Sequence, residues 1–219
     1  MLTLFGAMMS RAHRVVWMLK ELGLAYHHVP TNFLDGSTRQ PEFLEVNPNG
    51  RVPAIVDGDL RLFESMAINL YLAKKHAGPL GPVDLREDAL ATQWSFWVVT
   101  EVEKPLLLAA ANLYLFAEAA RNADEAAMAL DKLQRPFAVL EAHLQTRDFL
   151  ISDRFTVADL NVAAVLTLLP LAGIDVDAYP QMKAWLFACL ERPAASDWKS
   201  VKFSIPRPPT ALGMLRMFV

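Results

Sequence analysis

Two serines stand where a folded chain could present a hydroxyl to a ligand. Ser10 follows a short apolar segment and opens a helical pattern, so backbone N–H groups and the helix dipole favour an anion there. Glu64 and Ser65 occupy the same kind of position at a later helix start, where Ser65 can hold a carboxylate and Glu64 can face an ammonium group. Ordinary helix capping explains both positions equally directly. The residue types alone leave capping and ligand binding open.

A third motif is the dipeptide Val52-Pro53, which stands directly before a predicted strand. Because only about 5% of X-Pro bonds in folded proteins are cis, the sequence by itself favours a trans loop. A cis bond would instead turn the N–H and C=O of Val52 outward, where an extended peptide could pair with them. All three motifs stand at strand ends or helix starts, and we expect them along one rim of one sheet.

The elements that must position these residues follow from periodicity. Short alternating segments predict strands at residues 1–6, 26–29, 54–56 and 60–63, the last two joined by a turn at Asp57-Gly58-Asp59. Apolar stripes at helical spacing predict helices over residues 10–22 and 65–72. The segment 41–53, rich in Pro and Asn, is assigned no element. The order predicts a mixed four-stranded sheet with helices on its faces.

The glycines divide the chain into two regions. Seven of nine lie in residues 6–81 and none in residues 82–172, so the second region is predicted to consist of long helices. These run from Asp84 past residue 108 with a kink at Pro105, over 124–146 with a bend at Pro136, over 160–169 ended by Pro170, and from 180 to 192. The third, opened by Thr156 and Asp159, is apolar all round and should be central.

The fold class is therefore α/β followed by all-α. We assign residues 1–78 to the sheet domain, 79–84 to a linker and 85–219 to a helical bundle with a tail. Three prolines prevent that tail, residues 196–219, from being one helix.

Composition excludes several classes of protein. With 53% apolar residues the chain can offset its conformational entropy by burial, so it is not disordered. Its formal charge of −3 lacks the basic excess of nucleic-acid-binding proteins. A single cysteine, Cys189, allows no internal disulfide, and the adjacent His27 and His28 point to opposite faces of a strand, so we expect no metal. No membrane-length segment or signal peptide is present, which predicts a cytoplasmic protein.

Several longer motifs carry a family resemblance. They are residues 10–15 (SRAHRV), 41–54 (PEFLEVNPNGRVPA), 62–68 (LFESMAI), 155–159 (FTVAD), and the stretch from Tyr179-Pro180 to Arg192-Pro193. In this order and spacing, over residues 1 to about 200, the chain resembles the glutathione S-transferases, in their serine-type, bacterial-like cytosolic form. The resemblance implies a thioredoxin-like first domain, a helical second domain, a homodimer, glutathione as cosubstrate and a role in detoxification.

The resemblance also implies roles for the three motifs. Ser10 would donate a hydrogen bond to the glutathione sulfur and favour the thiolate. The Val52 backbone would pair with the cysteinyl part of the tripeptide, with Pro53 cis. Glu64 and Ser65 would hold the γ-glutamyl end.

Two arginines would complete this glutathione site. Arg39 and Arg51 could meet the glycyl carboxylate by charge-assisted hydrogen bonds, or could equally be solvated loop charges.

The second substrate is implied to be a small hydrophobic electrophile held between the domains. Its expected contacts are Met9, Trp97 and Leu108, although aromatic residues at helical spacing also suit a core. Glu101 or Glu103 would reach the glutathione amine in the partner subunit, or face solvent. The implied activity is transfer of glutathione to such electrophiles. Another glutathione-dependent reaction (isomerisation, dehalogenation, ether cleavage or peroxide reduction) and a non-catalytic binding module are the alternatives.

Overall fold

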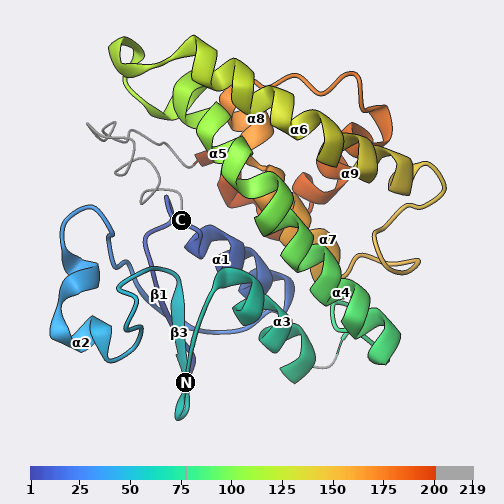
Figure 1. Ribbon diagram of the computed structural model, residues 1–219. Helices are drawn as coiled ribbons and strands as arrows, with labels where there is room; N and C mark the ends of the chain where they lie inside the picture. Colours follow the sequence, from blue (N-terminus) through green and yellow to red (C-terminus); the bar gives the residue numbers. More distant parts are fainter. Residues whose placement is uncertain (77, 201–219) are drawn as a thin grey trace.

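The computed structural model describes residues 1–76 and 78–200, and it has two parts (Figure 1). The first, drawn in blue to cyan, is a small sheet with helices packed on it. The second, drawn in green to red, is a set of helices beside it. The predicted fold class, a thioredoxin-like α/β domain followed by a helical domain, is confirmed. The predicted tail from residue 201 onward lies outside the described residues.

The sheet has four strands in the order β2-β1-β3-β4. They are β1 (Thr3–Phe5), β2 (His27–Val29), β3 (Ala54–Asp57) and β4 (Leu60–Phe63). β1 pairs in parallel with β2 and antiparallel with β3, which places Leu4 opposite Ile55, both without exposed surface. The βαβ unit followed by a hairpin is therefore present as predicted. β1 ends at the rim where Ser10 follows.

Three helices accompany the sheet. They are α1 (Ala12–Glu21), α2 (Pro41–Leu44) and α3 (Ser65–Lys75). α1 and α3 match the predicted apolar stripes, whereas α2 was not predicted. A helix of one turn is too short to show a period, yet Pro41 suits its first position and Phe43 is buried with its ring 6.0 Å from that of Phe5.

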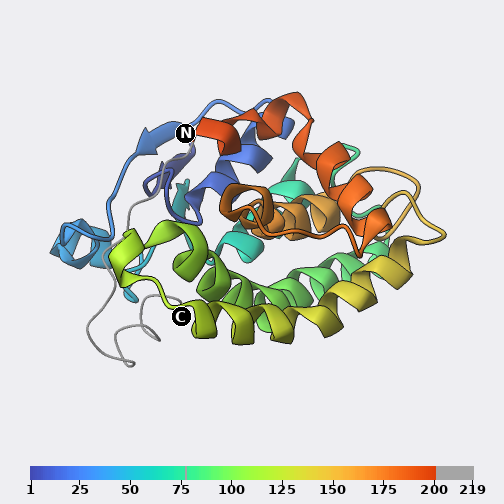
Figure 2. The same ribbon diagram turned by 90° about the horizontal axis from the view of Figure 1, so that it is seen from above.

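Up to residue 200, the second part is built from six α-helices and the turns between them. They are α4 (Leu85–Trp97), α5 (Glu103–Ala110), α6 (Ala123–Leu144), α7 (Val157–Leu166), α8 (Leu168–Ala172) and α9 (Pro180–Leu190). α4 and α5 form one long rod with α6 lying alongside, and α7 passes through the middle of the domain (Figures 1 and 2). Shorter helical turns lie at Ser37–Arg39 in the first part and at Glu118–Ala120 and Pro193–Ser200 in the second.

The rod changes pitch twice, at the π-helical turns η2 (Val98–Val102) and η3 (Ala111–Leu115). η2 lies just before Pro105, where a kink was predicted. A proline ring clashes with the carbonyl four residues earlier, here that of Glu101, and the wider turn moves this carbonyl aside. The extra residue rotates everything after it by about 100° around the helix axis.

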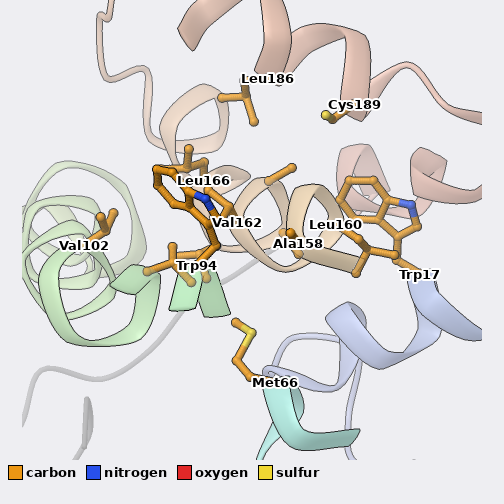
Figure 3. Packing of buried hydrophobic residues seen from close by; sticks show 14 of the residues in the cluster. Trp17, Met66, Trp94, Val102, Ala158, Leu160, Val162, Leu166, Leu186 and Cys189 are labelled. Atoms are coloured by element: carbon orange, nitrogen blue, oxygen red, sulfur yellow. The ribbon is translucent and has the colours of Figure 1, made fainter. Parts of the chain in front are cut away.

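Helix α7 is the centre of the core, as its composition predicts. All ten of its residues are buried, and Thr156 with Asp159 forms the predicted capping box at its start. Figure 3 shows Ala158, Leu160, Val162 and Leu166 on α7, surrounded by Trp17 of α1, Met66 of α3 and Leu186 of α9. The predicted end at Pro170 is wrong: α7 stops at Leu166, and Pro170 lies inside α8. Pro170 has no N–H to offer the Leu166 carbonyl, which explains the earlier stop.

Buried polar contacts join the two parts. Asn69 of α3 donates to Asn161 of α7 at 2.8 Å, and Asn161 donates to Ser95 of α4 at 2.9 Å. The segment around the predicted linker is held as well, because the N–H of Val157 donates to the Leu80 carbonyl at 2.9 Å. Among the residues described by the structure, no helix is both long and apolar enough to cross a membrane.

Candidate active site

A cavity of about 1140 Å³ lies between the rim of the sheet and the α4–α5 rod. Small-molecule sites usually enclose about 300–1,000 Å³, so this one has room for two reactants side by side. Its wall includes these candidate residues, all predicted from the sequence: Met9, Ser10, Arg39, Arg51, Val52, Pro53, Glu64 and Ser65. The structure thus brings together the three motifs and both arginines.

Ser10 precedes α1, and its hydroxyl makes two local hydrogen bonds. Its Oγ accepts the N–H of Ala12 at 3.1 Å and donates to the Ala7 carbonyl at 2.6 Å. The first satisfies the N–H of Ala12, the first residue of α1, although the cap position itself is Arg11. The hydroxyl has a single proton, so donating to a ligand in the cavity requires it to rotate away from Ala7. The N–H of Ala12 can remain on the oxygen throughout.

Gly6 allows the Ser10 turn and the Val52 loop to approach each other. Its φ is +142°, and a Cβ there would stand 2.7 Å from the Ala12 Cβ and 3.2 Å from the Val52 Cβ. Contacts under 3.0 Å are not tolerated by real side chains. Glycine is therefore required at the point where the first helix and the third strand share one rim.

The Val52-Pro53 peptide bond is cis. This agrees with what the family resemblance implied, and the trans bond favoured by frequency alone is wrong. The frequency of cis X-Pro bonds is an average over many proteins, whereas the isomer of one bond is determined by the tertiary contacts of its loop. The loop is fixed by Asn47, whose side-chain amide donates to the Arg51 carbonyl at 2.7 Å.

Glu64 and Ser65 begin α3 in an unusual backbone conformation. Glu64 has φ 71° and ψ 115°, which makes it the non-glycine residue with positive φ in the described part of the chain. Such backbone costs of order 1–3 kcal/mol and is found preferentially at functional sites. Here it directs the chain so that Glu64 and the buried Ser65 both line the cavity.

Arg39 and Arg51 come from the segment between β2 and β3. Nη1 of Arg39 donates to the Asn49 carbonyl at 3.4 Å. Gly50, with φ +60°, packs against the same guanidinium, and a Cβ there would meet Nη1 at 2.7 Å. The loop therefore gives the solvent-exposed Arg39 side chain a contact with its own backbone.

A buried ion-pair cluster beside Ser10 was missed by the sequence reasoning. Arg14 of α1 and Glu103 of α5 are only 2% and 5% exposed, and Nη2 of Arg14 lies 2.6 Å from Oε1 of Glu103. Nε of Arg11 reaches the same oxygen at 2.5 Å, and Nη1 of Arg14 lies 3.4 Å from the Ser65 hydroxyl. Local patterns cannot pair residues 89 positions apart, so nothing in the sequence indicates this contact.

This cluster determines the charge state of Glu103. Burial by itself would raise the pKa of the carboxyl, but the guanidiniums of Arg14 and Arg11 outweigh it and lower the pKa to about 2. The expectation that Glu103 reaches a partner subunit is therefore corrected, because its carboxylate is buried against its own first domain. Glu103 lies on the same face of the rod as Phe96 and Val99, the face that lines the cavity. Glu101 lies within that turn and is exposed.

His13 links the Ser10 turn to the second domain. Its Nδ1 lies 2.8 Å from the Ser10 carbonyl and its Nε2 lies 3.2 Å from the Ala164 carbonyl of α7. Burial, assisted by the charge of Arg14, lowers the pKa of His13 to about 4. The ring is therefore neutral at pH 7, and its single N–H donates to one of these two carbonyls, depending on the tautomer.

The wall expected to hold an electrophile is only partly as predicted. Met9 lines the cavity, but Trp97 and Leu108 do not. Trp97 packs edge to face on Trp94, with ring centroids 4.9 Å apart. The rod presents Phe96, Val99, Lys104 and Leu107 instead. The cavity face of the rod is thus shifted by one residue from the expected one, to Phe96 in place of Trp97 and to Leu107 in place of Leu108. In the described ranges, no three His, Cys, Asp or Glu side chains group in a way that could hold a metal.

Comparisons with known proteins agree with this architecture. Residues 1–74 match the family model of the glutathione S-transferase N-terminal domain, and residues 104–193 match that of the C-terminal domain. Glutathione S-transferase 3 of Zea mays is 37% identical, over 95% of this chain and 96% of its own length. Glutathione S-transferase D7 of Drosophila melanogaster is 30% identical, over 84% of this chain and 82% of its own.

Solved structures extend the comparison to the fold. A theta class glutathione S-transferase from Xanthomonas axonopodis pv. citri, with glutathione bound, superposes with a TM-score of 0.85 at 27% identity, covering 93% of this chain and 99% of the other. Glutathione S-transferase I from maize, in complex with an atrazine glutathione conjugate, gives 0.80 at 34% identity, covering 91% and 96%. The chain therefore belongs to the glutathione S-transferase family.

Proposed function

We propose that this protein transfers the thiolate of glutathione to an electrophilic carbon of a hydrophobic compound. The observation that carries the proposal is the convergence on one cavity of Ser10, the cis Val52-Pro53 bond and the Glu64-Ser65 helix start. Maize glutathione S-transferase I, a related protein, holds the glutathione conjugate of atrazine. The 1140 Å³ cavity offers space for both reactants.

Each part of glutathione has matching partners in the cavity wall. We assign the γ-glutamyl carboxylate to the Ser65 hydroxyl and the N-terminus of α3, and the ammonium group to the carboxylate of Glu64. The cysteinyl backbone pairs with the N–H and C=O of Val52. The glycyl carboxylate lies between Arg39 and Arg51. This places the sulfur at the Ser10 turn.

The chemical step follows from the properties of a thiol. Its ordinary pKa is about 8.5, and a value of about 6.5 would make most of it thiolate at pH 7, which requires about 2.7 kcal/mol of differential stabilisation. The Ser10 hydroxyl supplies part of it by donating to the sulfur, and the proton leaves to water. The thiolate then forms the S–C bond, and the leaving group departs with its electron pair. This assignment is the serine-type mechanism, in which Ser10 is never the nucleophile.

We further propose a cytoplasmic homodimer, as the family resemblance implies. Glu101, exposed on the π-helical turn, remains the candidate for a contact with the partner's glutathione. In this arrangement Glu103 instead holds α5 to α1 within one subunit.

The test compares wild type with Ser10→Ala on immobilised glutathione and in conjugation of a chlorinated dinitrobenzene. Both proteins should bind the column. The kcat/KM for conjugation should fall roughly 10- to 100-fold in the variant, because it loses one hydrogen bond to a charged sulfur. Ser152→Ala, in a loop away from the cavity, is the matched control and should behave as wild type. A protein that neither binds glutathione nor conjugates would point to the non-catalytic alternative.

A further inference from the structure

The part of the cavity beyond Ser10 combines an apolar wall with basic side chains. Met9 comes from the turn before α1, Val99 and Leu107 from the rod, and Leu168 from α8. This lobe, defined by these four residues with Arg11 and Lys104, is the space left for the second reactant once glutathione occupies the rim. An electrophile seated there contacts hydrocarbon and cations at the same time.

The basic side chains outnumber the acidic ones in this lobe. Arg11 and Arg14 share one carboxylate, since both reach Oε1 of Glu103. Lys104 follows Glu103 directly, is exposed and lines the cavity, and it forms no ion pair with any residue in ranges 1–76 and 78–200. Among the described residues of the wall, Glu64 is the remaining carboxylate, and it stands at the start of α3, in the part assigned to glutathione.

This excess of positive charge distinguishes electrophiles that carry a negative charge from neutral ones. A neutral apolar compound gains only from the hydrocarbon wall. A compound that also carries a carboxylate gains an ion pair with Lys104, but its charge is repelled by the glutathione thiolate at short range. The cations of Arg11 and Lys104 offset this repulsion, because both line the part of the cavity that the anion enters.

We propose that the preferred second substrates are amphiphilic electrophiles, with an apolar body that bears the reacting carbon and an anionic group, such as a carboxylate, bound by Lys104. The inference rests on the proposed transferase function. The anionic group takes no part in the reaction: the S–C bond forms at the activated carbon and the leaving group departs from that carbon. Lys104 is thus a specificity-determining residue, and Arg11 supports it.

The test uses a matched pair of probes, 4-chloro-3,5-dinitrobenzoate and its methyl ester, which differ in one negative charge. Each kcat/KM is divided by the uncatalysed rate constant with glutathione, so that intrinsic reactivity cancels. For wild type we expect the corrected kcat/KM of the acid to be about five times that of the ester, which is the gain that one partly exposed ion pair gives. Lys104→Met keeps most of the aliphatic chain and removes the charge, and its ratio should fall to about one.

Lys132→Met is the control, because Lys132 is an exposed lysine of α6 outside the cavity wall and its loss makes the same change in net charge. Its ratio should remain at the wild-type value, and added salt should lower the acid rate of wild type more than the ester rate. A wild-type ratio of one or less, or an unchanged ratio in Lys104→Met, overturns the inference while ester conjugation still upholds the transferase function. Conjugation of neither probe overturns both.

Discussion

Glu64 is the residue of the site with a strained backbone. Substitutions of Glu64 can therefore change glutathione binding and protein stability independently. A Cβ at φ 71° is strained, and glycine accepts this backbone without penalty. We predict that Glu64→Ala and Glu64→Gly both weaken glutathione binding, because both remove the carboxylate that faces the ammonium group. Glu64→Gly should nevertheless be more stable than Glu64→Ala, by about 1 kcal/mol.

Titration calorimetry with glutathione and urea unfolding of the two variants provide the measurements. An unchanged Kd would remove Glu64 from the binding site. Equal unfolding free energies for the two variants would show that the backbone at this position stores no strain.

At the scale of elements, Asp159 organises the start of α7. Its buried carboxylate accepts hydrogen bonds from the N–H groups of Leu150 and Thr156, from the Thr156 hydroxyl and from the Trp185 indole, at 2.9 to 3.1 Å. Burial raises the pKa of Asp159, although these donors oppose the effect. The carboxylate thereby ties α7 to α9 and to the loop before it.

Replacing Asp159 should therefore lower stability through unpaired donors rather than through lost volume. We predict a loss of about 3 kcal/mol or more for Asp159→Ala and a smaller loss for Asp159→Asn, whose amide oxygen still accepts. Chemical unfolding measures both, with Asp153→Asn, an exposed loop residue, as the matched control. A loss in Asp159→Ala no larger than in the control would contradict the structural role.

At the scale of the whole molecule, the domains meet through two groups that titrate, the half-buried His13 and the buried Glu103. Burial and Arg14 lower the pKa of His13 to about 4, so the folded protein resists the proton that the unfolded chain accepts near pH 6.5. This stabilisation is complete above pH 6.5 and is lost as the pH falls toward 4, by about 1.4 kcal/mol per pH unit. Glu103, with a pKa of about 2, adds a second loss between about pH 4.5 and 2.

The resulting prediction concerns urea unfolding at pH 7 and pH 5. Wild type should lose about 2 kcal/mol of unfolding free energy from His13, and His13→Gln, which keeps a donor for the Ala164 carbonyl without titrating, should lose less. The exposed His27→Gln serves as the matched control. The same pH dependence in His13→Gln and wild type would show that the interdomain histidine does not govern acid stability.

Much of this architecture could be predicted from local patterns. Period, capping residues and glycine placement predict the four strands, the α1 and α3 helices and the apolar α7, because each depends on neighbours in the sequence. The pairing of Arg14 with Glu103 depends on the docking of two domains and left no local signal. The proline at position 105 signalled an irregular turn, but which face of the rod lines the cavity, Phe96 and Leu107 rather than Trp97 and Leu108, depends on how the rod docks on the first domain and has no local signal.

The central claim is that Ser10 stabilises the glutathione thiolate, and titration of bound glutathione tests it most directly. The ultraviolet absorbance of the thiolate, recorded against pH for wild type, Ser10→Ala and Ser152→Ala, gives the apparent pKa of the bound thiol. We predict a value well below 8.5 for wild type and the Ser152→Ala control, and a value returning toward 8.5 for Ser10→Ala. The same lowered pKa in wild type and Ser10→Ala would contradict the assignment.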